Sequence, residues 1–564
     1  MNIAVKENKR LVFFIFLTAF FIRVLYIFQI LQFPLAEYLV RSSTFDQYTF
    51  DKMGAFIAAG NWLGNAEVFG KEPLYSYFLG VIYAVFGCNH FAVYFIQAVL
   101  SSIAVVLLYK AVQGIFNRIT AYIAAFIFAF YSISIFYDAL LLRASLITFL
   151  NVLLFYLVIK ALRSEKSLRW LWCGFVLGLS VLARQNMLFP FICAFILISV
   201  KPFKRAISCV SIVILGFFLV IAPVVVRNYM ISEKQGLRIS KEINAFWVGN
   251  THASSGVDVV WSPEYHRLEA ASEGSVRKMA GVFFSEIKKR PREYVGLYVR
   301  KIWMFLNGYE APSNTNYYLY REEFPTILRM SLFSFRLVCA LAIIGIFISI
   351  IKRRRAGLAY IFITILSASV ILFHIQSRFR LPAVPFFIMF AAYAVYYIFE
   401  KIKARDYRVS LFAVATLALL YIILAPDLTY AGFRPKGGRI RFLDRTNLAL
   451  SYIDDYEKDK EPCSLEAALR QCDLVLAYDR RYPTAYRIKG YVYFQEKEYK
   501  TSVREYKKAI IYDNRNPFLY NELAGVYFEA KDYNKAFIFT KRALRLFPGN
   551  KVFERNLAII PGVS

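Results

Sequence analysis

Long apolar runs separated by short charged segments dominate the first three quarters of the chain. Eleven of these runs are roughly 14 to 24 residues long, near the length at which a helix crosses a hydrocarbon core about 30 Å thick. They cover residues 11–31, 91–109, 119–137, 139–161, 169–184, 187–200, 206–229, 331–351, 357–375, 383–400 and 409–426. Two further runs, 74–87 and 294–306, are too short or too charged to span and are read as interfacial helices. The pattern predicts an all-α, polytopic transmembrane domain with about eleven spans.

Lysine and arginine gather in alternate connections between these runs, which places those connections on the cytoplasmic side. The remaining connections therefore face outward: 32–90, 230–330, the turns at Asp138 and Arg184, and the turn at 376–382. An odd number of spans puts the C-terminal portion outside as well. Several basic residues just after the last span favour the opposite side, but long tails follow the charge rule poorly. The repeat-bearing tail is therefore expected to be extracytoplasmic.

After the last apolar run the composition changes to a charged sequence rich in tyrosine and alanine. Pro483 and Pro517 stand 34 residues apart, and small and aromatic residues recur at matching offsets after each of them. This period resembles that of tetratricopeptide repeats, which stack helical pairs into a solenoid. We expect a transmembrane domain at 1–430, a linker at 431–445 and a repeat domain at 446–564. The repeats either bind a protein partner on their concave face or only stabilise the membrane domain.

Composition and charge narrow the class of protein further. The chain of 564 residues is 58% hydrophobic with mean hydropathy +0.45, which excludes an ordinary soluble protein. Its net charge of +30 comes largely from the cytoplasmic connections, and it suits anionic membrane lipids better than nucleic acid, because no basic stripe is interleaved with aromatic residues. The seven cysteines show no metal-finger spacing. Cys463 and Cys472 are either a disulfide, if the tail is exported, or two buried thiols.

The sequence lacks the motifs that bind soluble activated donors. It contains no GxxxxGK[ST] loop, no GxGxxG after a strand and no DxD pair, and neither HExxH nor GxSxG occurs. An enzyme working on the outer face of a bacterial membrane has no general supply of nucleotides there. We therefore expect its activated group to arrive on a lipid carrier, and polyprenyl-phosphate sugars are donors of that kind.

Charged residues in the outward connections supply candidates for the chemistry of such a transfer. Asp46, Asp51 and Lys71 lie in the first outward loop, in the polar stretch 43–78. Asp138 lies in a later outward turn. The complete set of candidates is Asp46, Lys71, Asp138, Arg184, Arg378 and Arg380.

The order of these residues resembles the GT-C superfamily of membrane glycosyltransferases, in the group that includes protein O-mannosyltransferases and aminoarabinose transferases. The resemblance covers nearly all of residues 1–430, and no single element of it is specific. It departs at two places: Gln47 follows Asp46 where a second acidic residue is frequent, and Glu72 replaces the first of two prolines. The similar elements are Asp46, the K-x-P-L-Y sequence from Lys71, the acidic turn at Asp138, the L-x-R turn ending at Arg184 and the sequence SRFRLPAVP from Ser377.

The resemblance implies transfer of a sugar from a polyprenyl-phosphate carrier to a lipid, glycan or protein acceptor. Such a transfer needs a base for the acceptor proton and positive charge for the departing phosphate. Asp46 suits the base: it would remove the acceptor proton as the acceptor oxygen attacks the anomeric carbon from the face opposite phosphate, so that this carbon is inverted. Lys71, Arg378 and Arg380 suit the phosphate, with Arg184 as a further cation. Asp138 would orient the acceptor or one of these cations.

Each role has a simpler alternative. Aspartates in loops commonly cap helices, the arginines would also suit lipid headgroups, and Asp138 is the natural partner for Arg143, which a membrane span would otherwise bury unpaired. No cofactor is implied, and a divalent metal stays open without a ligand cluster to support it. Two other functions stay open: an oligosaccharide ligase or polymerase of the cell envelope, and a non-enzymatic scaffold built on the repeats. We expect a multi-pass protein of the cytoplasmic membrane.

Overall fold

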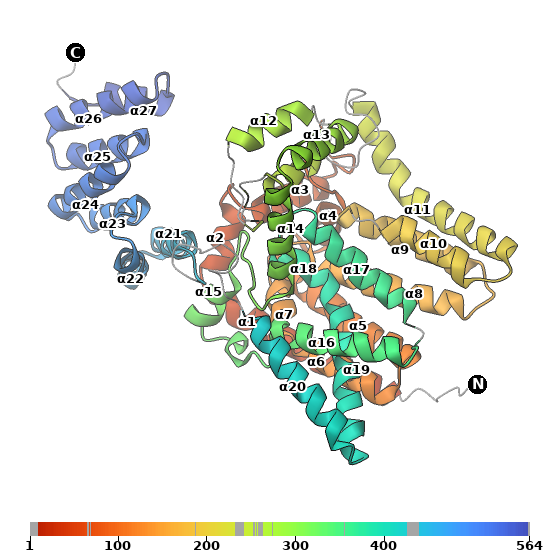
Figure 1. Cartoon of the computed structure of the whole chain (residues 1–564). Coiled ribbons are helices and arrows are strands. Elements are labelled where there is room, and N and C mark those ends of the chain that lie inside the picture. The colour runs from red at the N-terminus through yellow and green to blue at the C-terminus, as the bar shows by residue number, and fades with distance from the viewer. Residues whose placement is uncertain are drawn as a thin grey trace. The chain divides into compact units, whose positions relative to one another are not determined.

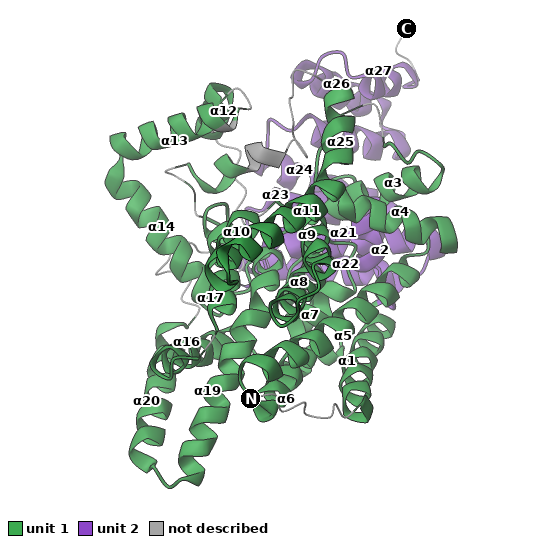
Figure 2. Cartoon of the chain, turned by 90° about the vertical axis from the view of Figure 1, so that its right-hand side faces the viewer, with its two compact units in different colours: residues 1–30, 42–433 green, residues 31–41, 434–564 purple. Residues whose placement is uncertain are grey.

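The structure is a computed structural model in which helices are connected by short turns (Figure 1). It describes residues 9–561 apart from 65–66, 68, 186–187, 232–241, 252–253, 255, 258–262, 273–274, 355 and 426–438. No strand occurs among these described residues. The chain divides into two compact units, residues 1–30 with 42–433 and residues 31–41 with 434–564 (Figure 2). The all-α expectation is confirmed for the described residues.

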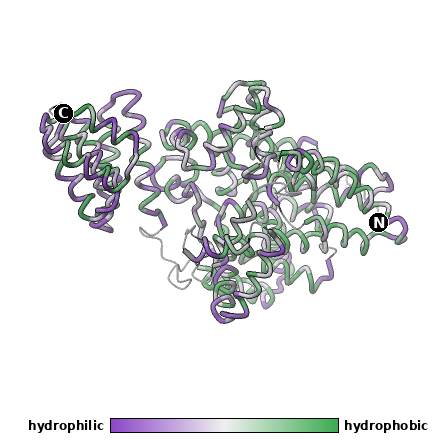
Figure 3. The backbone as a smooth tube through the Cα atoms, turned by 90° about the horizontal axis from the view of Figure 1, so that it is seen from above, coloured by the Kyte–Doolittle hydropathy of each residue, from purple (hydrophilic) through white to green (hydrophobic). Residues whose placement is uncertain are grey.

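The first unit contains most of the apolar helices (Figure 3). Its helices are α1 (Lys9–Ile30), α3 (Asp46–Ala58), α4 (Leu74–Phe86), α5 (His90–Ile115), α6 (Arg118–Ala129), α7 (Ser132–Asp138), α8 (Ala144–Leu162), α9 (Leu168–Ala183), α10 (Leu188–Ser199), α11 (Phe203–Ile231), α12 (Pro263–Ser272), α13 (Val276–Lys289), α14 (Pro291–Leu306), α15 (Tyr317–Glu323), α16 (Phe335–Ile351), α17 (Gly357–Ile371), α18 (Ser377–Arg380), α19 (Val384–Lys403) and α20 (Tyr407–Ile423), joined in places by the short 3-10 helices η2 (Glu242–Gly249), η3 (Ile327–Met330) and η4 (Leu381–Ala383).

Six helical segments of the described chain are long and apolar enough to cross a membrane. The count becomes seven if α6 and α7, which meet at a bend of 51°, form one broken span. Five more apolar helices are shorter: α4, α9, α10, α17 and α20. The expected count of about eleven spans stays a prediction, because it depends on whether these five shorter helices cross the membrane.

Small residues let the long helices pack closely. A Cβ atom on Gly174 of α9 would lie 2.1 Å from the Val213 carbonyl oxygen of α11, and one on Gly216 would lie 2.3 Å from the Leu171 carbonyl oxygen. On α16, a Cβ atom at Gly345 would lie 1.9 Å from the Phe390 carbonyl oxygen of α19. Backbones that approach this closely gain packing contacts, as is usual between helices of membrane proteins.

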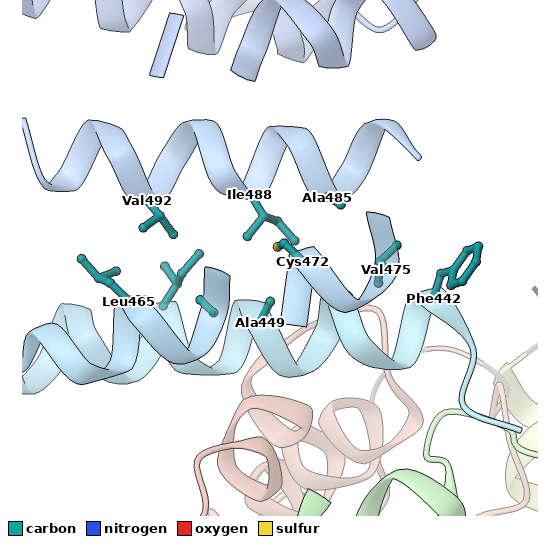
Figure 4. Close-up of a cluster of buried hydrophobic side chains, with 10 residues drawn as sticks. Phe442, Ala449, Leu465, Cys472, Val475, Ala485, Ile488 and Val492 are labelled. Carbon is teal, nitrogen blue, oxygen red and sulfur yellow. The ribbon is translucent and has the colours of Figure 1, made fainter. Parts of the chain in front are cut away.

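The second unit is a row of antiparallel helices that begins with a helix from the first loop. Its core includes Phe442, Leu465, Cys472, Ile488 and Val492 (Figure 4). The free Cys472 is buried, and Cys463 is exposed and also free. Its helices are α2 (Leu35–Arg41), α21 (Phe442–Asp459), α22 (Pro462–Tyr478), α23 (Pro483–Gln495), α24 (Tyr499–Tyr512), α25 (Pro517–Glu529), α26 (Tyr533–Leu546) and α27 (Lys551–Ala558).

The repeats predicted at 483 and 517 each coincide with a helical pair, α23 with α24 and α25 with α26. Pro483 and Pro517 occupy the first position of α23 and α25, where the missing amide hydrogen costs no helical hydrogen bond. The assignment to tetratricopeptide repeats itself stays a prediction. The first helix of this row, α21, begins at Phe442 rather than near 446, and much of the expected linker lies outside the described residues.

Candidate active site

Asp46 is the first residue of α3, in the connection between α1 and α4. A carboxylate at this position is favoured by the positive end of the helix dipole. The helix is held by close packing on α4, where a Cβ atom at Gly80 would lie 2.6 Å from the Ile57 side chain and one at Gly54 would lie 2.7 Å from Leu79. The short approach of the two helices fixes the position of Asp46.

Two cations from distant parts of the chain meet the Asp46 carboxylate. Lys71, three residues before α4, binds Oδ1, and the guanidinium of Arg378 on α18 donates to Oδ2 at 2.5 Å. The side chains are partly open, with exposed fractions of 24% for Asp46, 26% for Lys71 and 15% for Arg378. Solvent or a substrate can therefore reach the cluster of Asp46, Lys71 and Arg378, which we call the carboxylate cluster.

The charges around Asp46 determine its protonation. Burial opposes ionisation, but the positive charges and hydrogen bonds of Arg378 and Lys71 outweigh it and hold the pKa of Asp46 well below its ordinary value. The carboxylate is therefore ionised throughout the physiological pH range. In this state it is a weak base, and it becomes a better one when another anion takes over its two cations.

A second ion pair supports the segment that carries Lys71. The neighbouring Glu72 is 4% exposed and pairs with Arg143, which immediately precedes α8. The two cations also share one aromatic ring: Lys71 Nζ lies 5.1 Å and the Arg143 guanidinium 5.9 Å from the centroid of the Phe50 ring. The backbone amide of Gln185 also donates to Glu72, at 3.5 Å. Glu72 thus connects the segment that carries Lys71 to the turn before α8 and to the turn after α9.

Arg184 lies beside the carboxylate cluster through a shared aromatic ring. Its guanidinium is 3.8 Å from the centroid of Phe379, and the guanidinium of Arg378 is 4.7 Å from the same centroid. Asn151 and Ser369 line a small hollow next to this ring. The structure therefore brings Arg184 close to Arg378, as expected of a further cation of the site, although its contact is a ring and not the Asp46 carboxylate.

Asp138 makes different contacts from those expected. Its carboxylate is 1% exposed and accepts hydrogen bonds from Arg23 Nε at 2.8 Å and Ser101 Oγ at 2.6 Å. Arg23 lies within α1, and it also donates to the backbone carbonyls of Ala19 and Ala129. Asp138 therefore neutralises a buried arginine in the membrane unit, and it is Glu72 that pairs with Arg143.

Arg380 also belongs to a buried network. It is 1% exposed, pairs with Glu310 at 2.7 Å and donates to the backbone carbonyls of Phe305, Asn307 and Tyr309. These contacts use most of its donors. Of the two arginines on α18, Arg378 contacts Asp46 and Arg380 holds the chain that precedes α15.

Asp51, the other acidic residue of α3, lies outside the carboxylate cluster. It accepts hydrogen bonds from Tyr83 at 2.7 Å and shares one with His90 at 2.9 Å. The described residues contain no group of three or more histidine, cysteine, aspartate or glutamate side chains that could hold a metal ion. Asp46 offers one carboxylate, and its two oxygens already bind Lys71 and Arg378.

Sequence reasoning missed Arg23, Glu72 and Glu310 as partners of the expected residues. A signal existed for Arg23, because it is the one arginine inside the apolar run 11–31, and a charge there needs a partner. Glu72 was noted only as a departure from the family pattern. Glu310 has no local signal, since its partner Arg380 is 70 residues away.

Comparison with known proteins gives a partial family match. The family model "Dolichyl-phosphate-mannose-protein mannosyltransferase" matches residues 70–227, which include Lys71, Asp138 and Arg184. The match spans 158 of the 564 residues, short of half the chain. No curated protein matches the chain significantly. Together with the apolar helices, the family match supports a multi-pass membrane protein that is similar to membrane mannosyltransferases over residues 70–227.

Several solved structures of the Archaeoglobus fulgidus oligosaccharyltransferase are similar. The apo form is 14% identical with a TM-score of 0.44, and the alignment covers 76% of this chain and 56% of that one. The complex of AglB with an inhibitory peptide and a dolichol-phosphate is 14% identical with a TM-score of 0.42, covering 80% and 60%. The chain thus spans a little over half the length of these proteins. Both TM-scores lie below 0.5.

Proposed function

We propose that the chain transfers a sugar from a polyprenyl-phosphate carrier to an acceptor hydroxyl at the outer face of the cytoplasmic membrane. The observation that carries this proposal is the carboxylate cluster: one partly exposed aspartate lies between a lysine and an arginine from separate outward segments. A base and two cations in reach of one another are the groups that this reaction requires. Acceptors of three kinds, a lipid, a glycan or a protein, fit this chemistry.

The donor phosphate has the charge to compete with Asp46 for its partners. Lys71 and Arg378 would bind two phosphate oxygens, and the carboxylate would be released toward the acceptor. Losing its two positive neighbours raises the basicity of Asp46, so the base becomes effective once the donor is in place. Arg184, beside Arg378 on the Phe379 ring, would add positive charge near the leaving group.

The reaction itself is a displacement at the anomeric carbon. The acceptor oxygen forms a bond to that carbon and passes its proton to Asp46, while the carbon–oxygen bond to phosphate breaks and its electron pair leaves with the phosphate. Attack opposite the leaving group inverts the configuration. Polyprenyl phosphate departs as an anion, so no general acid is needed, and Lys71 with Arg378 stabilises the charge that develops on it.

The test is transfer by the purified full-length protein from a panel of polyprenyl-phosphate sugars, with released polyprenyl phosphate as the readout. Asp46→Asn should abolish release in the presence of acceptor and keep the thermal unfolding midpoint of the wild type. Asp51→Asn is the matched control, because the carboxylate of Asp51 is on the same helix but lies outside the carboxylate cluster. This variant should stay active. Turnover by Asp46→Asn at the wild-type rate would refute the mechanism.

A further inference from the structure

Helices α13 and α14 form an elbow in the outward segment between η2 and α16 (Figures 1 and 2). The inner side of α13 packs with Met279, Val282 and Phe283 against a buried cluster that contains Phe246 and Trp247. Its orientation is therefore fixed by packing, and the opposite side of the helix faces away from the protein.

Helix α13 carries four exposed cations and one large exposed apolar side chain, and one of the cations, Lys289, forms an ion pair with Glu286 at 3.1 Å. Arg277, Lys278, Lys288 and Lys289 are exposed, and Phe284, between them, is 62% exposed. Positions 277, 284 and 288 recur at helical spacing and so share one side of the helix. The single carboxylate of the helix, Glu286, is buried at 5% exposure on the inner side.

The outer face of α14 is chemically different. Tyr294, Leu297 and other side chains face inward, while Val295, Val299 and Ile302 face outward with exposed fractions of 63%, 60% and 45%. These three residues are spaced four and three apart, which forms a continuous apolar stripe. A helix that is apolar on its outer as well as its inner side is typical of contact with lipid.

We propose that the α13–α14 elbow binds anionic phospholipid headgroups of the outward leaflet, with α13 at the headgroup level and the α14 stripe against the acyl chains. The order of cationic and apolar side chains along the chain supports this partner. Four cations lie at the elbow, Lys288, Lys289, Arg290 and Arg292, and the apolar stripe begins after them at Val295. Cations followed by an apolar face match the boundary between headgroups and hydrocarbon, and Phe284 has the size to insert beside the headgroups.

The charge of the segment favours lipids that carry a net negative charge. Residues 276–300 contain seven lysines and arginines and two glutamates. A cation at an anionic membrane surface is worth about a fivefold gain in affinity. A soluble acidic glycan would match the charge but would leave the outward stripe of α14 in water, so the lipid surface is the better partner.

The test places a photoreactive phenylalanine analogue at position 284 of the full-length protein, in nanodiscs of phosphatidylcholine with about a third phosphatidylglycerol. Ultraviolet irradiation should give lipid adducts in which phosphatidylglycerol exceeds its mole fraction several-fold, measured by mass spectrometry of the protein. Arg277→Gln with Lys278→Gln and Lys288→Gln should bring that excess down to the mole fraction. The exposed lysines of the repeat unit supply a matched control, Lys500→Gln with Lys507→Gln and Lys551→Gln, which should keep it.

Two results would overturn this inference. One is the absence of a lipid adduct at position 284, or an adduct that follows the bulk lipid composition in the unaltered protein. The other is loss of the adduct when a soluble polyanionic saccharide is added, which would identify a glycan-binding face. Both readouts come from the wild-type cation set, so poor folding of the triple variant does not obscure them, and neither depends on sugar transfer.

Discussion

The substitution Asp138→Asn separates a structural aspartate from a catalytic one. Arg23 and Asp138 are 0% and 1% exposed and joined by a hydrogen bond of 2.8 Å. Removing one partner of a buried ion pair costs about 3–5 kcal/mol, because the remaining charge is left without compensation. Asn retains an acceptor, and Arg23 keeps its bonds to the carbonyls of Ala19 and Ala129, so we expect a loss near the lower limit, about 3 kcal/mol. That loss changes the unfolding equilibrium about a hundredfold.

The assay measures two quantities on the same detergent-purified sample: the thermal unfolding midpoint, and sugar transfer per folded molecule at a temperature where the variant is intact. We expect a lower midpoint for Asp138→Asn and near wild-type transfer by the folded fraction. Replacing both partners, Arg23→Met with Asp138→Leu, removes the unpaired charge and should regain most of the stability. A variant Asp138→Asn that unfolds like the wild type but transfers no sugar would refute this reasoning and return Asp138 to the active site.

Three further predictions concern other parts of the membrane unit. Arg378→Gln should lower transfer by about 10²–10³-fold at an unchanged unfolding midpoint, because it removes a cation aimed at the leaving phosphate, whereas a drop in the midpoint with full transfer would contradict that role. Burial lowers the pKa of Lys301 to about 7 from the ordinary 10.5. Between these pH values the unfolded chain binds more protons than the folded one, so the free energy of unfolding rises with pH. The unfolding midpoint of the wild type should therefore be higher at pH 8.5 than at pH 6.5, and Lys301→Met should lose this difference. Gly345→Ala should destabilise by a few kcal/mol because its Cβ would meet the Phe390 carbonyl oxygen at 1.9 Å, while Gly296→Ala, with nothing within 4 Å, should be neutral or stabilising in the same thermal unfolding assay.

Helices that are bounded by proline and glycine could be predicted closely from the sequence. The apolar run 74–87 corresponds to α4 at Leu74–Phe86, with Pro73 before it and Gly87, at φ of 69°, after it. The run 119–137 reads as one span but is bent by 51° between α6 and α7. The residues at the break are apolar, so hydropathy shows no interruption, and the carbonyl of Ala129 at the end of α6 accepts from Arg23 of α1. A contact 106 residues away is not visible in a local pattern.

For the candidate site, the residue types could be predicted from the sequence, and the pairing of their side chains could not. The alternating basic loops predict the same side of the membrane for Asp46, Lys71 and Arg378, and the structure joins these three residues. Asp138 and Arg380 have the same residue types and the same predicted side, yet each pairs with a buried partner instead. Which of two arginines on one turn of α18 faces the aspartate depends on side-chain packing, and that information is absent from the sequence pattern.

Helix α2 has a consequence for any attempt to shorten the protein. Its residues Leu35, Ala36, Leu39 and Val40 are buried, and its charged side chains pair with α21, Glu37 with Lys458 at 3.0 Å and Arg41 with Asp454 at 3.7 Å. The helix lies in the chain between α1 and α3, and only four residues, 42–45, separate it from Asp46. Deleting residues 434–564 would therefore expose the buried apolar side chains of α2 in the loop between α1 and α3. The second unit therefore cannot be removed without affecting the first loop. A truncated protein that fails to transfer sugar would give little information about the function of the predicted repeats.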